Sequence, residues 1–181
     1  VVNGVANSGG DAQGDTLAGV ESLIGSNFND TLTGDGGNNV LSGGSGNDTI
    51  EGGAGADTID GGSGTGDTAS YAASSNAVTV SLASGNGSGG DAQGDTLTGI
   101  ENLTGSANGD TLTGDGGNNV LSGGGGDDLL VGGGGADTLI GGSGNDTVSY
   151  AASGSGVTVR LDGSAATGGD AAGDTLSGVE N

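Results

Sequence analysis

The sequence lacks cysteine, histidine, lysine, proline, methionine and tryptophan, and it has only three aromatic residues, Phe28, Tyr71 and Tyr150. Without cysteine there can be no disulfide or thiolate metal site, and without histidine the usual ligand of zinc, copper and nickel is missing. No nucleophile has a histidine or lysine to activate it, so we expect that the chain is not an enzyme. No apolar run approaches the roughly 20 residues that a membrane-spanning helix needs, so we expect no membrane insertion.

Positive charge is almost absent, because Arg160 is the single basic residue against 23 acidic residues, which gives a formal net charge of −22. Such a chain cannot neutralise phosphates, so we expect no nucleic acid as a partner. Self-repulsion on this scale opposes a compact state and favours cations as partners. Only oxygen ligands are available, and a flexible oxygen site that is rich in backbone carbonyls favours Ca²⁺ over Mg²⁺.

Glycine contributes 48 of the 181 residues, a frequency that costs much backbone entropy in a conventional fold. Internal repeats offer another source of order. The segment DAQGDTLAGVES from Asp11 recurs as DAQGDTLTGIEN from Asp91 and as DAAGDTLSGVEN from Asp170, at spacings of 80 and 79 residues. Both ends of the sequence fall within this repeat, so we expect the chain to be a segment of a larger repeat protein.

A shorter period of nine residues fills two runs of five turns each, starting at Gly25 and Gly105, with the pattern G-G-x-G-x-D-x-U-x, where U is a large aliphatic residue. Glycines permit positive φ in a tight turn. The x-U-x triplet predicts a very short strand whose single inward side chain stacks on its counterparts in neighbouring coils. Between the runs, the alternating segments AVTVSL from Ala77 and GVTVRL from Gly156 predict conventional strands, and DTL and IENL after Asp91 predict two shorter ones.

These periods divide the chain into five segments. They are the end of a preceding repeat at 1–24, a first nonapeptide run at 25–71, connecting strands at 72–104, a second run at 105–150, and the start of the next repeat at 151–181. Since the long repeats are near-duplicates, we expect one continuous solenoid.

The nonapeptides resemble the RTX (repeats-in-toxin) family of calcium-binding proteins. The resemblance implies an all-β, right-handed parallel β-roll in which two nonapeptides form one full turn of the roll. It also implies that Ca²⁺ lies in the glycine and aspartate turns, between nonapeptide n and nonapeptide n+2, on carboxylates and carbonyls. The sixth-position residues that match the family's ligands are Asp30, Asn39, Asp48, Asp57, Asp67, Asp110, Asn119, Asp128, Asp137 and Asp146.

Five turns in a run form three n/n+2 pairs, so two runs predict about six calcium sites. We expect weaker sites at Asn39 and Asn119, which lack the charge, and an inserted residue near Gly66 disturbs the pattern before Asp67. An ion that binds only the ordered state stabilises it, so folding should depend on calcium. The alternative is that the sixth-position side chains only cap glycine turns through Asx hydrogen bonds.

Other acidic residues recur outside the nonapeptides. The sequence leaves open a solvated or turn-forming role and a ligand role for six aspartates that recur at each long period: Asp11, Asp15, Asp91, Asp95, Asp170 and Asp174. Four glutamates are expected to be surface charges: Glu21, Glu51, Glu101 and Glu180.

Two functions agree with these features. The 80-residue duplication favours a structural repeat of an extracellular bacterial protein, such as an adhesin, a surface-layer protein or a filament subunit, whose open edges could associate end to end. The alternative is the C-terminal folding and secretion module of a secreted enzyme or toxin whose catalytic domain lies elsewhere. In both cases the resemblance implies type I secretion from a Gram-negative bacterium. A minor third possibility is recognition of an ordered surface such as ice by Thr31, Thr33, Thr111 and Thr113.

Overall fold

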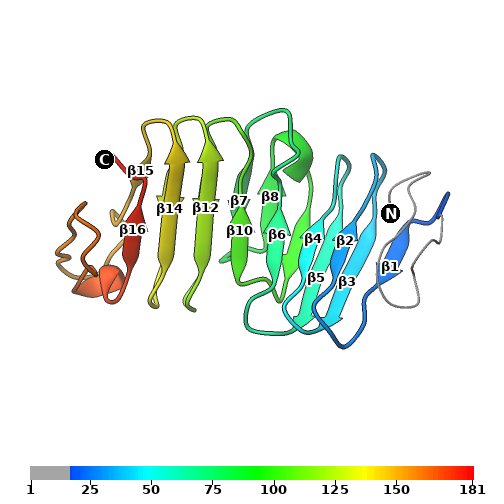
Figure 1. Cartoon of the computed structure of the whole chain (residues 1–181), viewed down its shortest axis with the longest axis horizontal. Coiled ribbons are helices and arrows are strands. Elements are labelled where there is room, and N and C mark those ends of the chain that lie inside the picture. The colour runs from blue at the N-terminus through cyan, green and yellow to red at the C-terminus, as the bar shows by residue number, and fades with distance from the viewer. Residues whose placement is uncertain (1–16) are drawn as a thin grey trace.

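The structure is a computed structural model, and it describes residues 17–181. Figure 1 shows short strands side by side along one long axis, from the blue β1 to the red β16. They form two sheets. The nine-stranded sheet has the order β1 (Ser22–Ile24), β3 (Val40–Ser45), β5 (Thr58–Ser63), β9 (Thr96–Thr98), β8 (Asn86–Ser88), β7 (Thr79–Ser81), β11 (Thr111–Thr113), β13 (Leu129–Val131) and β15 (Thr147–Val148). The seven-stranded sheet has the order β16 (Thr175–Ser177), β14 (Thr138–Ser143), β12 (Val120–Gly125), β10 (Asn102–Thr104), β6 (Thr68–Ser70), β4 (Thr49–Glu51) and β2 (Thr31–Thr33).

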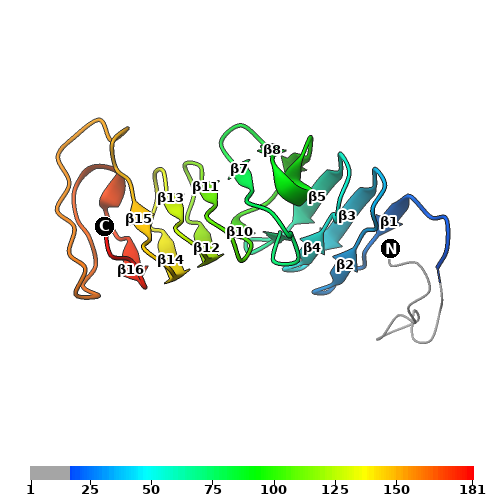
Figure 2. The same ribbon diagram turned by 90° about the horizontal axis from the view of Figure 1, so that it is seen from above.

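Within each run, consecutive strands alternate between the two sheets, so that two nonapeptides complete one coil (Figure 2). Each strand therefore pairs in parallel with the strand two nonapeptides further along. Leu41 pairs with Ile59 in one sheet, and Leu121 pairs with Leu139 in the other. These aliphatic residues are fully buried and form a narrow core column. The predicted parallel β-roll is confirmed.

The chain between the runs interrupts the parallel pattern once. Strand β8 pairs antiparallel with β7 and with β9, which inserts a hairpin into the nine-stranded sheet between β9 and β11. A short 3₁₀ helix, η2 (Gly90–Ala92), connects β8 to β9, and η3 (Gly169–Ala171) lies at the equivalent place in the second repeat. The two short strands predicted from DTL and IENL are β9 and β10.

The strand predicted at 156–161 is wrong. This segment forms only an isolated antiparallel bridge between Thr158 and Thr167. Its first-repeat equivalent, β7, is held on its other side by parallel pairing with β11. Among the described residues, no strand pairs in this way with residues 156–161. This segment therefore lacks a partner strand of the kind that orders β7.

Equivalent strands of the two long repeats lie in opposite sheets. Strands β1 and β5 belong to the nine-stranded sheet, whereas their equivalents β10 and β14 belong to the seven-stranded sheet. The chain changes sheet at each step from β1 to β7, stays in the nine-stranded sheet through β9, and changes again at β10. One 80-residue repeat therefore rotates the pattern by half a coil. The five segment boundaries remain predictions, and the first part of the segment 1–24, with Asp11 and Asp15, lies outside the described residues.

No helix among residues 17–181 has the length and apolar character needed to cross a bilayer.

Candidate calcium sites

The sixth-position side chains of the first run form hydrogen-bonded ladders along the edges of the roll. The Oδ1 atom of Asp48 accepts the backbone N–H of Asp30 at 2.8 Å, and Oδ1 of Asp67 accepts the N–H of Asp48 at 2.7 Å. On the other edge, Oδ1 of Asp57 accepts the N–H of Asn39 at 2.8 Å. Stacking of the coils thus brings together the n/n+2 pairs that the family resemblance implies.

The second run repeats this arrangement. Asp128 accepts the N–H of Asp110 at 2.7 Å, and Asp146 accepts the N–H of Asp128 at 2.9 Å. On the opposite edge, Asp137 accepts the N–H of Asn119 at 2.9 Å. In each case one carboxylate oxygen is used by the backbone of the preceding coil, which leaves the second oxygen available.

This second oxygen is buried and has no hydrogen-bond partner in six of the aspartates. They are Asp48, Asp57, Asp67, Asp128, Asp137 and Asp146, each through its Oδ2 atom. Burying a carboxylate oxygen without a partner is costly, and buried polar groups nearly always find a donor, a proton or a metal. The six orphaned oxygens therefore fit a cation or a proton as their partner.

Five of the six orphaned oxygens lie against the first-position glycine of their own turn, the exception being that of Asp67. A Cβ atom built on Gly43 would overlap Oδ2 of Asp48 and would lie 2.6 Å from the carbonyl oxygen of Gly61, in the next coil. Gly123 meets Oδ2 of Asp128 in the same way. The carboxylate oxygen thus packs directly against the glycine backbone, beside a carbonyl oxygen of the next coil, and only a residue without a Cβ atom permits this approach. An oxygen-only cradle of this kind fits Ca²⁺.

The second-position residue decides whether a turn has this open oxygen. Gly44 adopts φ +100°, in the left-handed region that favours glycine, and Oδ2 of Asp48 in that turn has no donor. Where the second position is Asp115, the φ value is not positive, and the Asp115 N–H donates to Oδ1 of Asn119 at 2.8 Å. The first two turns of each run are closed in this way, through Ser26, Asp35, Ser106 and Asp115.

No cluster of three or more His, Cys, Asp or Glu side chains suitable for a metal occurs within residues 17–181. A cation held in these turns must therefore take main-chain carbonyls as well as carboxylates as ligands. Six to eight oxygen ligands of this mixed kind are usual for Ca²⁺.

Comparison with protein families agrees with this geometry. The RTX calcium-binding nonapeptide repeat matches the chain in four places, at residues 15–50, 33–66, 95–130 and 122–152, which together cover more than half of the sequence. The chain belongs to the RTX calcium-binding nonapeptide-repeat family. A search of curated proteins found no match. Nine of the ten predicted ligand positions fall inside the matched segments, and Asp67 follows directly after one of them.

In some of the RTX turns the surroundings oppose the ionised form of the sixth-position aspartate. Burial raises the pKa of Asp128 to about 6 and that of Asp137 to about 6, although a backbone hydrogen bond from the preceding coil lowers each in part. Nearby carboxylates add to the rise, among them Asp110 beside Asp128 and Asp174 beside Asp137. A bound divalent cation would remove this repulsion and favour the ionised form.

The RTX ladder extends beyond the nonapeptides. Asp95 is fully buried, and its Oδ1 accepts the N–H of Asp57 at 2.9 Å across 38 residues of sequence. Its Oδ2 accepts the hydroxyl of Tyr71 at 3.0 Å. Asp174 and Tyr150 form the same contact at 2.7 Å. The sequence left the role of Asp95 and Asp174 open. The available signal was that tyrosine and aspartate recur together, 24 residues apart, in both repeats.

Two of the glutamates predicted to be surface charges also take part in the ladders. Glu101 is half-buried, and its Oε2 accepts the N–H of Asp67 at 3.0 Å. Glu180 is exposed, yet its Oε2 accepts the N–H of Asp146 at 2.9 Å. Each glutamate continues its ladder past the last nonapeptide of a run.

Proposed function

We propose that this chain is a calcium-binding structural repeat module of an extracellular bacterial surface protein, which folds on binding Ca²⁺ after secretion. Family membership supports calcium binding, and RTX repeats are typical of secreted proteins of Gram-negative bacteria. The ten sixth-position side chains are the proposed ligands. Each of the six orphaned oxygens belongs to the second member of one n/n+2 pair, which supports about six sites.

The charge of the chain supports coupling between calcium and folding. Six Ca²⁺ ions would offset about 12 of the 22 net negative charges. Without them the fold would bury several carboxylates next to one another, which opposes the ordered state. Glycine-rich turns also lose much entropy on ordering. We therefore expect the metal-free chain to be largely disordered.

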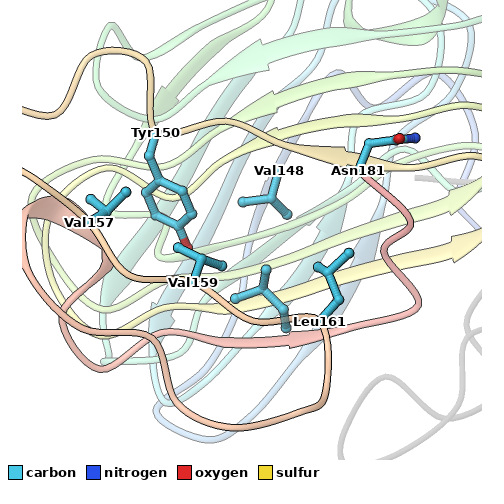
Figure 3. Close-up of a pocket in the computed structure, with 7 residues that line it drawn as sticks. Val148, Tyr150, Val157, Val159, Leu161 and Asn181 are labelled. Carbon is cyan, nitrogen blue, oxygen red and sulfur yellow. The ribbon is translucent and has the colours of Figure 1, made fainter.

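One observation favours a repeating array over an enzyme module. An apolar pocket of about 320 Å³ lies at the C-terminal end of the roll (Figure 3), lined mainly by Val148, Tyr150, Val157, Val159 and Leu161. Val157 is 37 % exposed and Leu161 is 55 % exposed.

The first repeat contains the same surface in covered form. Val78 and Val80, the equivalents of Val157 and Val159, are 2 % and 0 % exposed. Strand β11 covers them, with Leu112 paired to Val80, while β10 pairs with β6 on the other sheet. The pocket therefore fits the two strands that open a further copy of the same repeat. This is the partner we propose for end-to-end association, and such a partner belongs to an array.

A circular dichroism titration of the metal-free chain tests the calcium-dependent fold, with Mg²⁺ as the control ion. We expect a transition from disordered chain to β structure with Ca²⁺ and none with Mg²⁺, because Mg²⁺ requires a near-ideal octahedral site. A chain that is already folded in chelator, or that stays disordered in millimolar Ca²⁺, would contradict the proposal.

The array is tested by attaching the sequence of residues 103–113 directly after Asn181. We expect the added strands to raise the thermal midpoint of the calcium-loaded protein and to reduce quenching of Tyr150 by acrylamide. In the control extension, aspartate replaces both leucines of the added segment, at the positions copied from Leu103 and Leu112. Equal behaviour of the two extensions would contradict the proposed partner and return the enzyme-module alternative to equal standing.

A further inference from the structure

Each nonapeptide run is followed by a tyrosine whose hydroxyl contacts the next carboxylate of the ladder. Tyr71 is buried at the end of β6, and its hydroxyl donates to Oδ2 of Asp95 at 3.0 Å. In the second repeat, Tyr150 donates to Oδ2 of Asp174 at 2.7 Å. The same pair therefore occurs twice, at equivalent positions of two independent repeats.

The candidate calcium turns are distinguished by a second carboxylate oxygen without a partner, and at Asp95 a tyrosine hydroxyl is the partner of this oxygen. Asp57 and Asp95 are neighbours in one ladder, and both give Oδ1 to the backbone of the preceding coil. Oδ2 of Asp57 has no partner, whereas Oδ2 of Asp95 has the hydroxyl of Tyr71. The second oxygen of Asp95 is therefore already satisfied by a neutral donor.

The glycine cradle is also missing beside Asp95. The residue five positions earlier is Gly90. A Cβ built on it would meet Ser74 Oγ at 2.5 Å and the Asn76 carbonyl oxygen at 2.7 Å. The carboxylate of Asp95 is not among the three atoms nearest to this Cβ. In the nonapeptide that contains Asp57, a Cβ built on Gly52 would instead overlap Oδ2 of that aspartate. The 3₁₀ turn η2 thus faces a serine hydroxyl, which accepts the N–H of Asp91 at 3.0 Å.

The hydroxyl stays a donor over the physiological pH range. Burial, and then the charge of Asp95, raise the pKa of Tyr71 far above its usual value, and burial likewise raises that of Tyr150. A protonated phenol directs its hydrogen at the carboxylate oxygen. It therefore occupies the direction from which a cation would approach.

We propose that Tyr71 and Tyr150 terminate the calcium ladders, so that Asp95 and Asp174 belong to the ladder but bind no calcium. This inference rests on the proposed function, in which the orphaned oxygens of the nonapeptide turns hold Ca²⁺. Each tyrosine replaces an ion by a metal-free contact at the junction between a run and the residues that follow it. The number of ions per repeat is thereby limited by the chain itself.

Calcium stoichiometry of the full chain, measured by native mass spectrometry and by calorimetric titration, tests the proposal. Asp95→Asn and Asp174→Asn keep the oxygen that accepts the backbone N–H, and we expect both to bind the wild-type number of ions. The matched control Asp57→Asn makes the same change one coil earlier and should lose one ion. Loss of an ion from Asp95→Asn or Asp174→Asn, in protein that circular dichroism shows to be folded, would overturn the proposal.

Tyr71→Phe provides the second readout. It leaves the buried oxygen of Asp95 without a donor, so we expect a lower thermal midpoint of the calcium-loaded chain and an ion count that does not fall. A lower ion count in Tyr71→Phe would place a cation at this contact and overturn the inference. Failure of the proposed function is distinct, because it would appear in the wild-type chain as no calcium uptake.

Discussion

One turn of the second run has two glycines at which alanine substitutions test the calcium cradle, one as the test and the other as its control. Gly132 and Gly134 lie two residues apart, and neither has a positive φ, so alanine fits the backbone at both positions. A Cβ on Gly132 would overlap Oδ2 of Asp137 and lie 3.2 Å from its Cβ, whereas a Cβ on Gly134 would have its nearest neighbour at 3.8 Å. The first repeat already has Ala54 at the position of Gly134.

The two substitutions should differ by the contribution of one ion. Gly132→Ala forces the carboxylate of Asp137 out of the cradle and breaks its contact with the Asn119 N–H. At a calcium concentration one hundred times Kd, a bound ion stabilises the folded state by about 2.7 kcal/mol. Gly134→Ala should be neutral or stabilising by up to about 1 kcal/mol, because alanine reduces the entropy of the unfolded chain. We therefore expect a difference of about 3 kcal/mol in the free energy of unfolding.

The assay is chemical unfolding of both variants in saturating Ca²⁺, together with calorimetric counting of bound ions. Gly132→Ala should lose one ion and Gly134→Ala none. If both variants bind as many ions as the wild type with equal stability, then the carboxylate oxygen that packs against the first-position glycine is not a calcium ligand. The sixth-position aspartates would in that case be turn caps.

Three further predictions follow from the same geometry. Asn39→Asp should tighten calcium binding, measured by calorimetry, more than Asn119→Asp. The reason is that the amide nitrogen of Asn39 has no partner, whereas that of Asn119 donates to the Glu101 carbonyl at 2.8 Å. Equal effects of the two substitutions would contradict this. Lowering the pH through 6 should weaken calcium binding, since burial raises the pKa of Asp128 to about 6 and protons then compete with the ion. Because this pKa lies above that of an unfolded aspartate, the same protonation should stabilise the metal-free fold. Circular dichroism in chelator should therefore show more β structure at pH 5 than at pH 7.5. Less β structure at pH 5 would contradict the reasoning. Leu121→Ala should destabilise the calcium-loaded fold by about 2–5 kcal/mol in chemical unfolding, as Leu121 is fully buried in the core column; a loss below about 1 kcal/mol would argue against a single packed column.

The nonapeptide turns could be predicted from the sequence because their contacts repeat at a short, constant spacing. The pattern predicts one inward aliphatic per nine residues, and the resemblance to RTX repeats implies a coil of two nonapeptides, from which the pairing of Leu41 with Ile59 follows. The pairing of sixth-position residues such as Asp30 and Asp48 follows for the same reason. The difference between open and closed turns was also present in the sequence, as glycine or Ser/Asp at the second position, but its meaning depended on the backbone φ.

The junction between the repeats was decided only by the tertiary structure. Asp95 reaches Asp57 across 38 residues, and Glu101 reaches Asp67 across 34, through an inserted hairpin whose length hides the ladder register in the sequence. That hairpin also places β14 in the sheet opposite to its equivalent β5. The sequence by itself determined the coil, its core column and the candidate calcium turns, since these arise from local periodicity. How one run is joined to the next depends on which strands pair with the hairpin. Such long-range pairing leaves no periodic pattern in the local sequence.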